Sequence, residues 1–403
     1  MKAIQSFNWK KNIILFLVSQ CTTLFGSTIV QMAIIWYVTM KTSSGAWVAA
    51  FTICSHMPQF LVSFVGGVWA DRYDRKKLII GSDAVIAAVT LVMMLSIPSI
   101  SSDPTLLCAL LLVSVIRSLG AGVQTPAVNA VIPQLVPKEQ LMRYNGINAT
   151  MQSIVQFAAP AAAGAIFTVS TLQSIMIVDI ITAAIGISLF SCVLLPQQNI
   201  LQEKVALLTD MKVGVKYAFS NKIIRNLLMV YGLYTFLCVP AGFLAGLLVR
   251  RVYGDTYWYL TVVELVGFAG MMIGGLVVST SNGFNNHIKT LFISLFTFGL
   301  FTIGIGISDN FILYLVLMLF YGVAMTIVQT SITTLIQEKT EVPMQGRILG
   351  LLSSMYSGFL PIGMATFGPL ADVISLKLII IGSGVALVLI ATTICCNCHF
   401  TDK

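Results

Sequence analysis

The sequence is dominated by long apolar segments that carry no charge. The first of them extends from Asn12 to Met40 without any Asp, Glu, Lys or Arg residue. A helix needs about 20 predominantly apolar residues to span the hydrocarbon core of a bilayer, and comparable segments recur as far as the C-terminal region. We therefore predict an all-α membrane protein with about twelve transmembrane helices.

The longest polar segment, 196–225, separates the expected helices into two groups. It begins with Pro196 and reads as a cytoplasmic linker, with a surface helix around Leu207 to Phe219. The chain is thereby divided into an N-terminal half, 1–195, and a C-terminal half, 226–403. The helices are expected at 13–38, 46–70, 78–97, 105–128, 146–169 and 173–195, then at 226–249, 257–279, 290–308, 311–333, 348–371 and 377–397.

The composition excludes several classes of protein. Only 9% of the residues are charged and 57% are hydrophobic, whereas soluble domains carry about 25% charged residues. The net charge of +8 does not indicate nucleic-acid binding, because the basic residues are scattered in short segments between apolar ones. No Gly-rich phosphate loop followed by Lys-Ser or Lys-Thr is present, so this chain is not expected to hydrolyse ATP. We expect no enzymatic activity, no cofactor and no metal, so the energy comes from an ion gradient, or the solute moves down its own gradient.

The distribution of Lys and Arg predicts the topology. If the N-terminus is cytoplasmic, most of the 23 basic residues lie inside, and the outside receives Lys41, Arg250, Arg251 and Lys377. Cytoplasmic loops are enriched in Lys and Arg, and an even number of helices returns the C-terminus to the same side. We therefore expect a multi-pass protein with both termini in the cytoplasm.

Two weak internal repeats relate the halves. The segment from Arg143 to Gly146 opens the fifth expected helix, and a similar one, from Arg347 to Gly350, opens the eleventh. A Gly-Gly pair at 66–67, near the end of the second helix, is matched by a pair at 274–275 in the eighth. Parallel repeats of this kind are a known plan of transporters, in which the substrate site lies at the interface of the repeats.

The most specific motif lies between the second and third expected helices. It reads Gly-Val-Trp-Ala-Asp-Arg-Tyr-Asp-Arg-Lys-Lys and runs from Gly67 to Lys77. A glycine permits close approach of two helices, Asp71 is placed to cap and pair at a helix end, and the basic cluster anchors the turn at the anionic inner leaflet. The motif resembles the signature loop of the major facilitator superfamily, with Asp74 where that family usually has glycine. The resemblance implies a conformational-switch loop made of Gly67, Asp71, Arg72, Asp74, Arg75 and Lys76.

Two weaker motifs resemble the same family. Arg117 in the fourth helix resembles its helix 4 arginine motif, and Pro160 with Gly164 in the fifth resembles the motif of its antiporters. The alternative for Pro160 and Gly164 is simple close packing of small residues. Most of the chain is also similar to the macrolide-efflux permease branch of the superfamily, most specifically in segments 31–35, 71–77, 117–120, 125–137 and 271–275. This resemblance implies export of amphipathic antibiotics, or related compounds, by proton exchange across a bacterial plasma membrane.

Ionisable residues within the expected helices are the candidates for proton coupling. A charge at the centre of a membrane helix costs about 2.5 to 3.5 kcal/mol on insertion scales, so a purely structural bundle has little reason to retain one. A carboxylate that meets an arginine in one state and not in another would bind and release protons. We predict Glu264 and Asp179 as the main carboxylates and Arg117 as the organiser. Asp83 and His56 are further candidates, and static pairing or hydrogen bonding is the alternative for each.

Several other residues are candidates for contact with the transported compound. Gln31 and Gln152 have polar side chains that can line a cavity, and Phe236 and Met271 suit an adaptable apolar pocket. The alternative is that they hold neighbouring helices together or face lipid. The C-terminal cysteines, Cys395 to Cys398, with His399, match no standard zinc spacing and read as free or palmitoylated thiols.

Three functions are compatible with these residues. The leading hypothesis is a monomeric, proton-coupled exporter of amphipathic drugs. A second is an exporter of an endogenous metabolite such as a siderophore. A third is a membrane scaffold or sensor that keeps the fold without transport, which the cost of the buried charges argues against.

Overall fold

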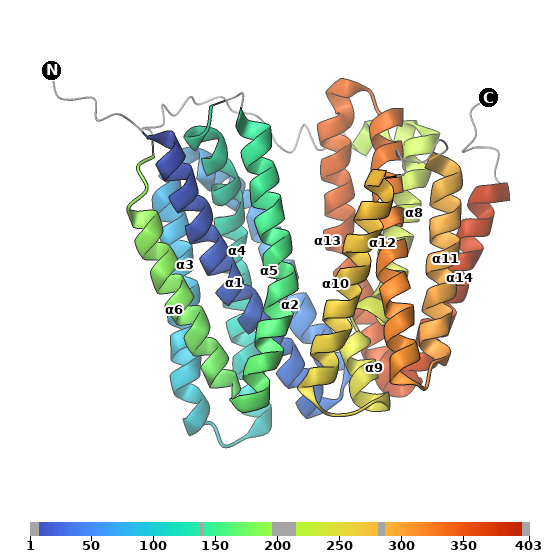
Figure 1. Cartoon of the computed structure of the whole chain (residues 1–403), viewed down its shortest axis with the longest axis horizontal. Helices are drawn as coiled ribbons and strands as arrows, with labels where there is room; N and C mark the ends of the chain where they lie inside the picture. The colour runs from blue at the N-terminus through green and yellow to red at the C-terminus, as the bar shows by residue number, and fades with distance from the viewer. Residues whose placement is uncertain (1–7, 138–139, 196–214, 281–286, 397–403) are drawn as a thin grey trace. The chain divides into compact units, whose positions relative to one another are not determined.

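A computed structural model describes residues 8–137, 140–195, 215–280 and 287–396, and these are almost entirely helical (Figure 1). Eleven stretches within the described helices are long and apolar enough to cross a membrane, and α2 adds an apolar helix of 28 residues. Large apolar side chains are exposed on the helices, for example Leu95 at 64% and Ile312 at 72%. Such surfaces face lipid in a membrane protein, so the predicted class of fold is confirmed.

The helices of the N-terminal part follow the expected segments closely. They are α1 (Trp9–Thr42), α2 (Gly45–Arg72), α3 (Arg75–Ser96), the 3₁₀ turn η1 (Ile97–Ser99), α4 (Asp103–Leu135), α5 (Leu141–Val169) and α6 (Leu172–Ser191). α4 continues past Pro126 and Pro133, seven residues beyond its predicted end at 128. Proline removes one backbone hydrogen bond but does not end a membrane helix whose neighbours satisfy the freed groups.

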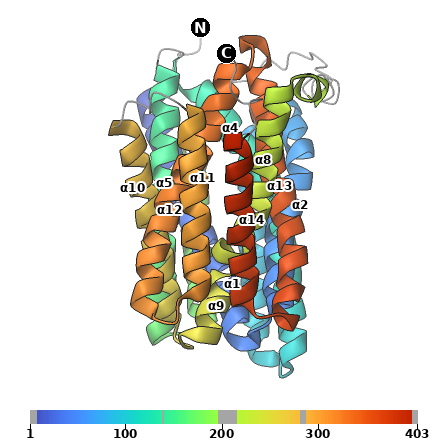
Figure 2. The same cartoon turned by 90° about the vertical axis from the view of Figure 1, so that its right-hand side faces the viewer.

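The C-terminal part contains one helix more than expected. It comprises α8 (Lys222–Gly242), α9 (Ala245–Val252), α10 (Tyr257–Thr280), α11 (His287–Ile307), α12 (Phe311–Lys339), α13 (Val342–Val373) and α14 (Leu376–Cys396), several of which Figure 2 shows side by side. The span predicted at 226–249 lies within one apolar stretch, Lys222–Val252, but its helix is not continuous, because the chain turns at Phe243 and Leu244. Pro240 lacks the amide proton of a helical hydrogen bond and Gly242 lowers helix propensity, so the break follows directly after them.

The helices form two compact units. One contains Met1–Val38 and Phe51–Gln202, and the other contains Thr39–Ala50 and Glu203–Lys403. The end of α1 and the first turn of α2 therefore pack with the C-terminal helices. Most of the predicted linker, including the surface helix around Leu207, lies outside the described residues, and residues 215–220 are helical.

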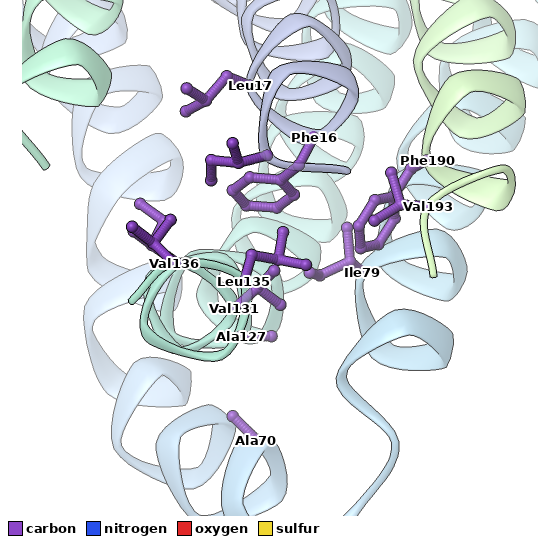
Figure 3. Close-up of a cluster of buried hydrophobic side chains, with 12 residues drawn as sticks. Phe16, Leu17, Ala70, Ile79, Ala127, Val131, Leu135, Val136, Phe190 and Val193 are labelled. Atoms are coloured by element: carbon purple, nitrogen blue, oxygen red, sulfur yellow. The ribbon is translucent and has the colours of Figure 1, made fainter. Parts of the chain in front are cut away.

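Apolar side chains fill the interior of the first unit where α1, α3, α4 and α6 meet. Phe16 of α1 and Phe190 of α6 are fully buried, with ring centroids 5.6 Å apart. Ile79 of α3 and Leu135 of α4 pack into the same cluster (Figure 3). This cluster lies at the start of α3 and the end of α4, which is the end of the unit that carries the basic loop of residues 73–77.

Glycines bring helices into backbone contact in both units. A Cβ atom added to Gly66 would lie 2.5 Å from the carbonyl oxygen of Gly122 in α4, and one added to Gly274 would lie 2.7 Å from that of Val323 in α12. A Cβ atom added to the second glycine of each pair, Gly67 or Gly275, would meet no neighbouring atom within 4 Å. The expected close approach at Gly67 is therefore wrong by one residue, because helix rotation turns Gly66 toward the neighbour.

Candidate functional site

A buried ion pair occupies the centre of the first unit. Arg117 of α4 and Asp179 of α6 lie 2.5 Å apart, between Nη1 and Oδ2, and their side chains are only 8% and 3% exposed. The hydroxyl of Thr90 in α3 lies 3.2 Å from the same oxygen of Asp179 and accepts a hydrogen bond from Arg117. Nη2 of Arg117 donates to the Oγ atom of Ser27 in α1, at 3.0 Å. Four helices are thus joined through one guanidinium group, whose planar set of donors suits such a junction.

A second buried carboxyl in this unit has no cationic partner. Asp83 of α3 is 6% exposed. Its Oδ1 atom accepts a hydrogen bond of 2.6 Å from Nε2 of Gln124 in α4. Among the described residues no Lys, Arg or His forms an ion pair with it. The sequence indicates a role for Asp83 but gives no signal for Gln124, Ser27 or Thr90, because neutral polar residues are common in membrane helices as interhelical hydrogen bonders.

The carboxyl group of Glu264 in the second unit has a different environment. Glu264 of α10 is half-buried and has neither a hydrogen bond nor an ion pair among the described residues. Lys and Arg residues in the described helices of this unit lie near helix ends, such as Lys222, Arg250 and Lys339. A glutamate in the apolar part of a helix without a cation is costly when ionised, so this position favours a neutral carboxyl group.

The interior of the second unit is instead rich in aromatic hydroxyl groups. Tyr321 of α12 lies 2.9 Å from the Sγ atom of Cys238 in α8. Its ring also packs 4.5 Å from that of Phe298 in α11, between centroids. The hydroxyl of the fully buried Tyr314 has no hydrogen-bond partner in the described part of the chain. This unit therefore offers polar hydrogen-bonding groups without a fixed charge.

The remaining residues predicted for protons or substrate are spread over several helices. His56 of α2 is half-buried, and its Nδ1 atom lies 2.9 Å from the carbonyl oxygen of Thr52 within the same helix. Gln31 is half-buried and Gln152 is exposed. Phe236 of α8 packs against Phe367 of α13 with centroids 4.8 Å apart. Met271 of α10 is half-buried, and its carbonyl oxygen accepts a bond from Thr326 of α12 at 3.2 Å.

The loop of residues 73–77 is held by bonds to helix ends. Asp74 caps the N-terminus of α3, since its side chain accepts from the backbone N–H groups of Lys76 and Lys77. Arg75 donates to the carbonyl oxygens of Ala70 and Ala130, each at 2.7 Å.

The loop also reaches the end of α6. Lys76 donates to the carbonyl oxygens of Ser191 and Val193, at 2.7 and 2.8 Å. Arg72 is exposed, and the side chain of Asp71 lies outside the described part of the structure. The loop therefore ties together the ends of α2, α4 and α6 through carbonyl groups, which complements their helix dipoles.

Pro160 and Gly164 are both buried within α5, one turn apart. They lie on the same face of the helix as Ala163, which is also fully buried. Small residues on one face suit close helix packing.

A polar cluster absent from the sequence predictions joins the first turn of α2 to the end of α13. The carboxylate of Asp372 accepts bonds from the backbone N–H groups of Gly45 and Ala46, at 2.7 and 3.0 Å, and from the hydroxyl of Ser44 at 2.7 Å. Arg251 of α9 pairs with the same carboxylate at 2.7 Å. These five residues form the outer cluster. Asp372 thus acts as an N-cap of α2 supplied from far along the sequence.

Comparisons with known proteins agree on the type of protein. The sequence model described as Major Facilitator Superfamily matches residues 15–364. The chain is 30% identical over 388 residues to Macrolide efflux protein A of Streptococcus pyogenes, covering 95% of each protein. It is 21% identical to the Staphyloferrin A transporter of Staphylococcus aureus, over 89% of each. Among solved structures, a mutant of the nucleoside transporter NupG is similar with a TM-score of 0.73 at 14% identity, covering 96% of this chain and 99% of that one.

Proposed function

The chain belongs to the major facilitator superfamily, and on that premise we propose that it is a secondary active exporter of amphipathic drugs, driven by proton antiport. The superfamily and the multi-pass helical fold make it a membrane transporter. The compound, the coupling ion and the direction of transport are the proposed part.

The observation that carries the proposal is the unpartnered Glu264 in a membrane-spanning helix. A carboxyl group without a cation in this setting can hold a proton when it faces an apolar environment and release it when water reaches it. A site that alternates between these two environments can take part in coupling protons to transport. Glu264 is therefore the proposed proton carrier of the C-terminal half.

The Arg117–Asp179 network has a supporting role in this proposal. Its bonds to Ser27 and Thr90 connect α1, α3, α4 and α6. Four helices linked at one buried point can move as a rigid body, which alternating access by rocking requires of each half. Arg117 is thus the proposed organiser of the N-terminal half.

The proposed class of substrate is inferred from the similarity to Macrolide efflux protein A. The similarity extends over 388 residues and 95% of both chains, so it is not limited to one half of the molecule. The proposed location is the bacterial plasma membrane with both termini in the cytoplasm.

Drug susceptibility tests the proposal. The chain is expressed in a drug-hypersensitive bacterium, and inhibitory concentrations of macrolides, tetracyclines and cationic dyes are measured with and without a protonophore. We expect resistance to at least one amphipathic class, and its loss when the protonophore is added. Glu264→Gln should abolish resistance at unchanged protein level, whereas the control Glu341→Gln, at an exposed helix end, should not. Resistance that persists in Glu264→Gln would contradict the role of Glu264.

Export of an endogenous metabolite is the second candidate. It is favoured by the similarity to the Staphyloferrin A transporter, although that similarity is at 21% identity. If no drug is exported, release of siderophore from expressing and deletion strains distinguishes the two candidates. Full biological activity after neutralisation of both Arg117 and Glu264 would instead support a scaffold or sensor.

A further inference from the structure

Two polar layers lie one above the other along the interface of α3 and α4. The first contains Thr90 of α3 and Arg117 of α4, and the second contains Asp83 of α3 and Gln124 of α4. Within each helix the two layers are seven residues apart, which is two turns or about 10 Å. Ile86 separates them, packed so closely on Gly120 that an added Cβ would lie 2.8 Å from Cγ1 of Ile86.

The charges of the first layer balance each other. Asp179 neutralises Arg117, and both side chains are almost fully buried. Protonation of Asp179 would leave the guanidinium group without a counter-charge, and breaking a buried pair in this way is strongly unfavourable. Asp179 is therefore better suited to hold Arg117 in place than to exchange a proton.

Among the residues whose side chains the structure describes, the second layer contains a carboxyl group and no cation. α3 packs mainly against α4 and α6, and the charged side chains of these two helices nearest to Asp83 are Arg117 and Asp179, which already pair with each other. The basic residues that open α3 are Arg75, Lys76 and Lys77, at least six residues or about 9 Å along the helix from Asp83.

The other groups around this layer do not supply a cation either. Arg75 and Lys76 donate to backbone carbonyl groups at helix ends, and Lys77 is exposed. His56 of α2 bonds within its own helix, Arg72 is exposed at the end of α2, and the side chain of Asp71 lies outside the described part. Asp103 opens α4 at its opposite end.

A carboxamide is a suitable partner for a carboxyl group that gains and loses a proton. With a neutral Asp83, its O–H can donate to Oε1 of Gln124 while Nε2 donates to the carboxyl C=O, so that both hydrogen bonds of the pair are made. With an ionised Asp83, only the Nε2–H bond remains, and Oε1 of Gln124 faces an oxygen that cannot donate. The protonated form of Asp83 thus has both hydrogen bonds with Gln124, whereas the ionised form needs water as an additional hydrogen-bond donor.

From this geometry we propose that Asp83, positioned by Gln124, is the proton-binding carboxyl of the N-terminal half, and that Asp179 serves as the structural partner of Arg117. The proposal deepens the proton antiport proposed above and rests on it. The exchange consists of one O–H bond formed or broken, with water as the proton donor and acceptor. Asp83 is the ninth residue of α3, about 12 Å from the end of the helix that carries the basic loop, so water is expected to reach it from that side.

Infrared difference spectroscopy tests the proton site without any drug. Purified full-length protein is compared in acidic and alkaline buffer, in a Glu264→Gln background that silences the other unpaired carboxyl group. We expect a band of a protonated carboxyl C=O group that is lost in Asp83→Asn and shifts in Gln124→Leu. The band should persist when the ion pair is removed as a whole, in Arg117→Gln with Asp179→Asn. A band that persists in Asp83→Asn and disappears with the ion pair would overturn the proposal.

A transport measurement separates the proton site from the proposed function. In proteoliposomes with erythromycin as the probe, Asp83→Asn should retain exchange of labelled for unlabelled drug and lose stimulation by a pH gradient. If the original protein does not transport erythromycin, the drug assignment fails while the infrared result still decides the proton site. If Asp83→Asn keeps full stimulation by the pH gradient, the assignment of Asp83 is wrong.

Discussion

The two units of the molecule differ in how the main carboxyl groups within their membrane helices are paired. In the first unit Asp179 is neutralised by Arg117, and the pair joins four helices. In the second unit Glu264 has no ion pair among the described residues, and the surrounding interior offers tyrosine hydroxyls and a thiol. A buried pair fixes helices in place, whereas an unpaired carboxyl remains free to change its protonation state. The first unit thus carries a fixed ion pair in addition to the unpaired carboxyl group of Asp83, whereas Glu264 of the second unit is unpaired among the described residues.

Removing one member of the ion pair should give the largest effect. Arg117→Gln leaves Asp179 buried without its partner, which typically costs about 3 to 5 kcal/mol. We expect a strongly lowered unfolding temperature in detergent, measured by size-exclusion chromatography after heating. Glu264→Gln is the matched change in the other unit and should leave the unfolding temperature almost unchanged.

The double variant shows whether the charge or the side chain matters. Arg117→Gln combined with Asp179→Asn removes both charges, so it should recover most of the lost stability. Equal unfolding temperatures for Arg117→Gln and the original protein would contradict the proposed difference between the units, because they would show that the ion pair does not stabilise the first unit.

Leucine substitutions at the glycine pairs should lower stability by an intermediate amount. They test whether the two units use the first glycine of the pair for helix packing in the same way. Gly66→Leu and Gly274→Leu place a side chain against the backbone of the neighbouring helix, and overpacking of this kind costs about 1 to 3 kcal/mol. Gly67→Leu and Gly275→Leu are the matched controls, since both positions are open. The measurement is the unfolding temperature of the four variants in the same detergent. A similar loss at Gly66 and Gly67 would contradict the observed rotation of α2.

The outer cluster should give the smallest effect. Asp372→Ala removes the cap from the first turn of α2 and the partner of Arg251, and loss of a cap costs about 1 kcal/mol. Asp255→Ala is the control, because this exposed carboxylate lies 3.9 Å from Arg250 and surface pairs contribute little. Hydrogen exchange of the amides of Gly45 and Ala46 should increase in Asp372→Ala alone. Unchanged exchange would show that another group caps α2.

The sequence determined the helices and the type of protein. A long apolar segment in a bilayer must satisfy its own backbone hydrogen bonds, so it becomes a helix whatever its neighbours are. The expected segments 105–128 and 311–333 accordingly appear within α4 and α12. The loop motif from Gly67 to Lys77 and the similarity to efflux permeases indicated the superfamily that the comparisons support.

Only the tertiary structure decided which polar groups meet. Arg117 and Asp179 were candidates from the sequence as single charges, but their pairing with Ser27 and Thr90 depends on the rotation of four helices about their axes. Gly66 rather than Gly67 faces α4 for the same reason. A segment that is apolar on all sides has no polar face to orient it, so packing between helices, not the pattern along one helix, selects the partners of each buried charge.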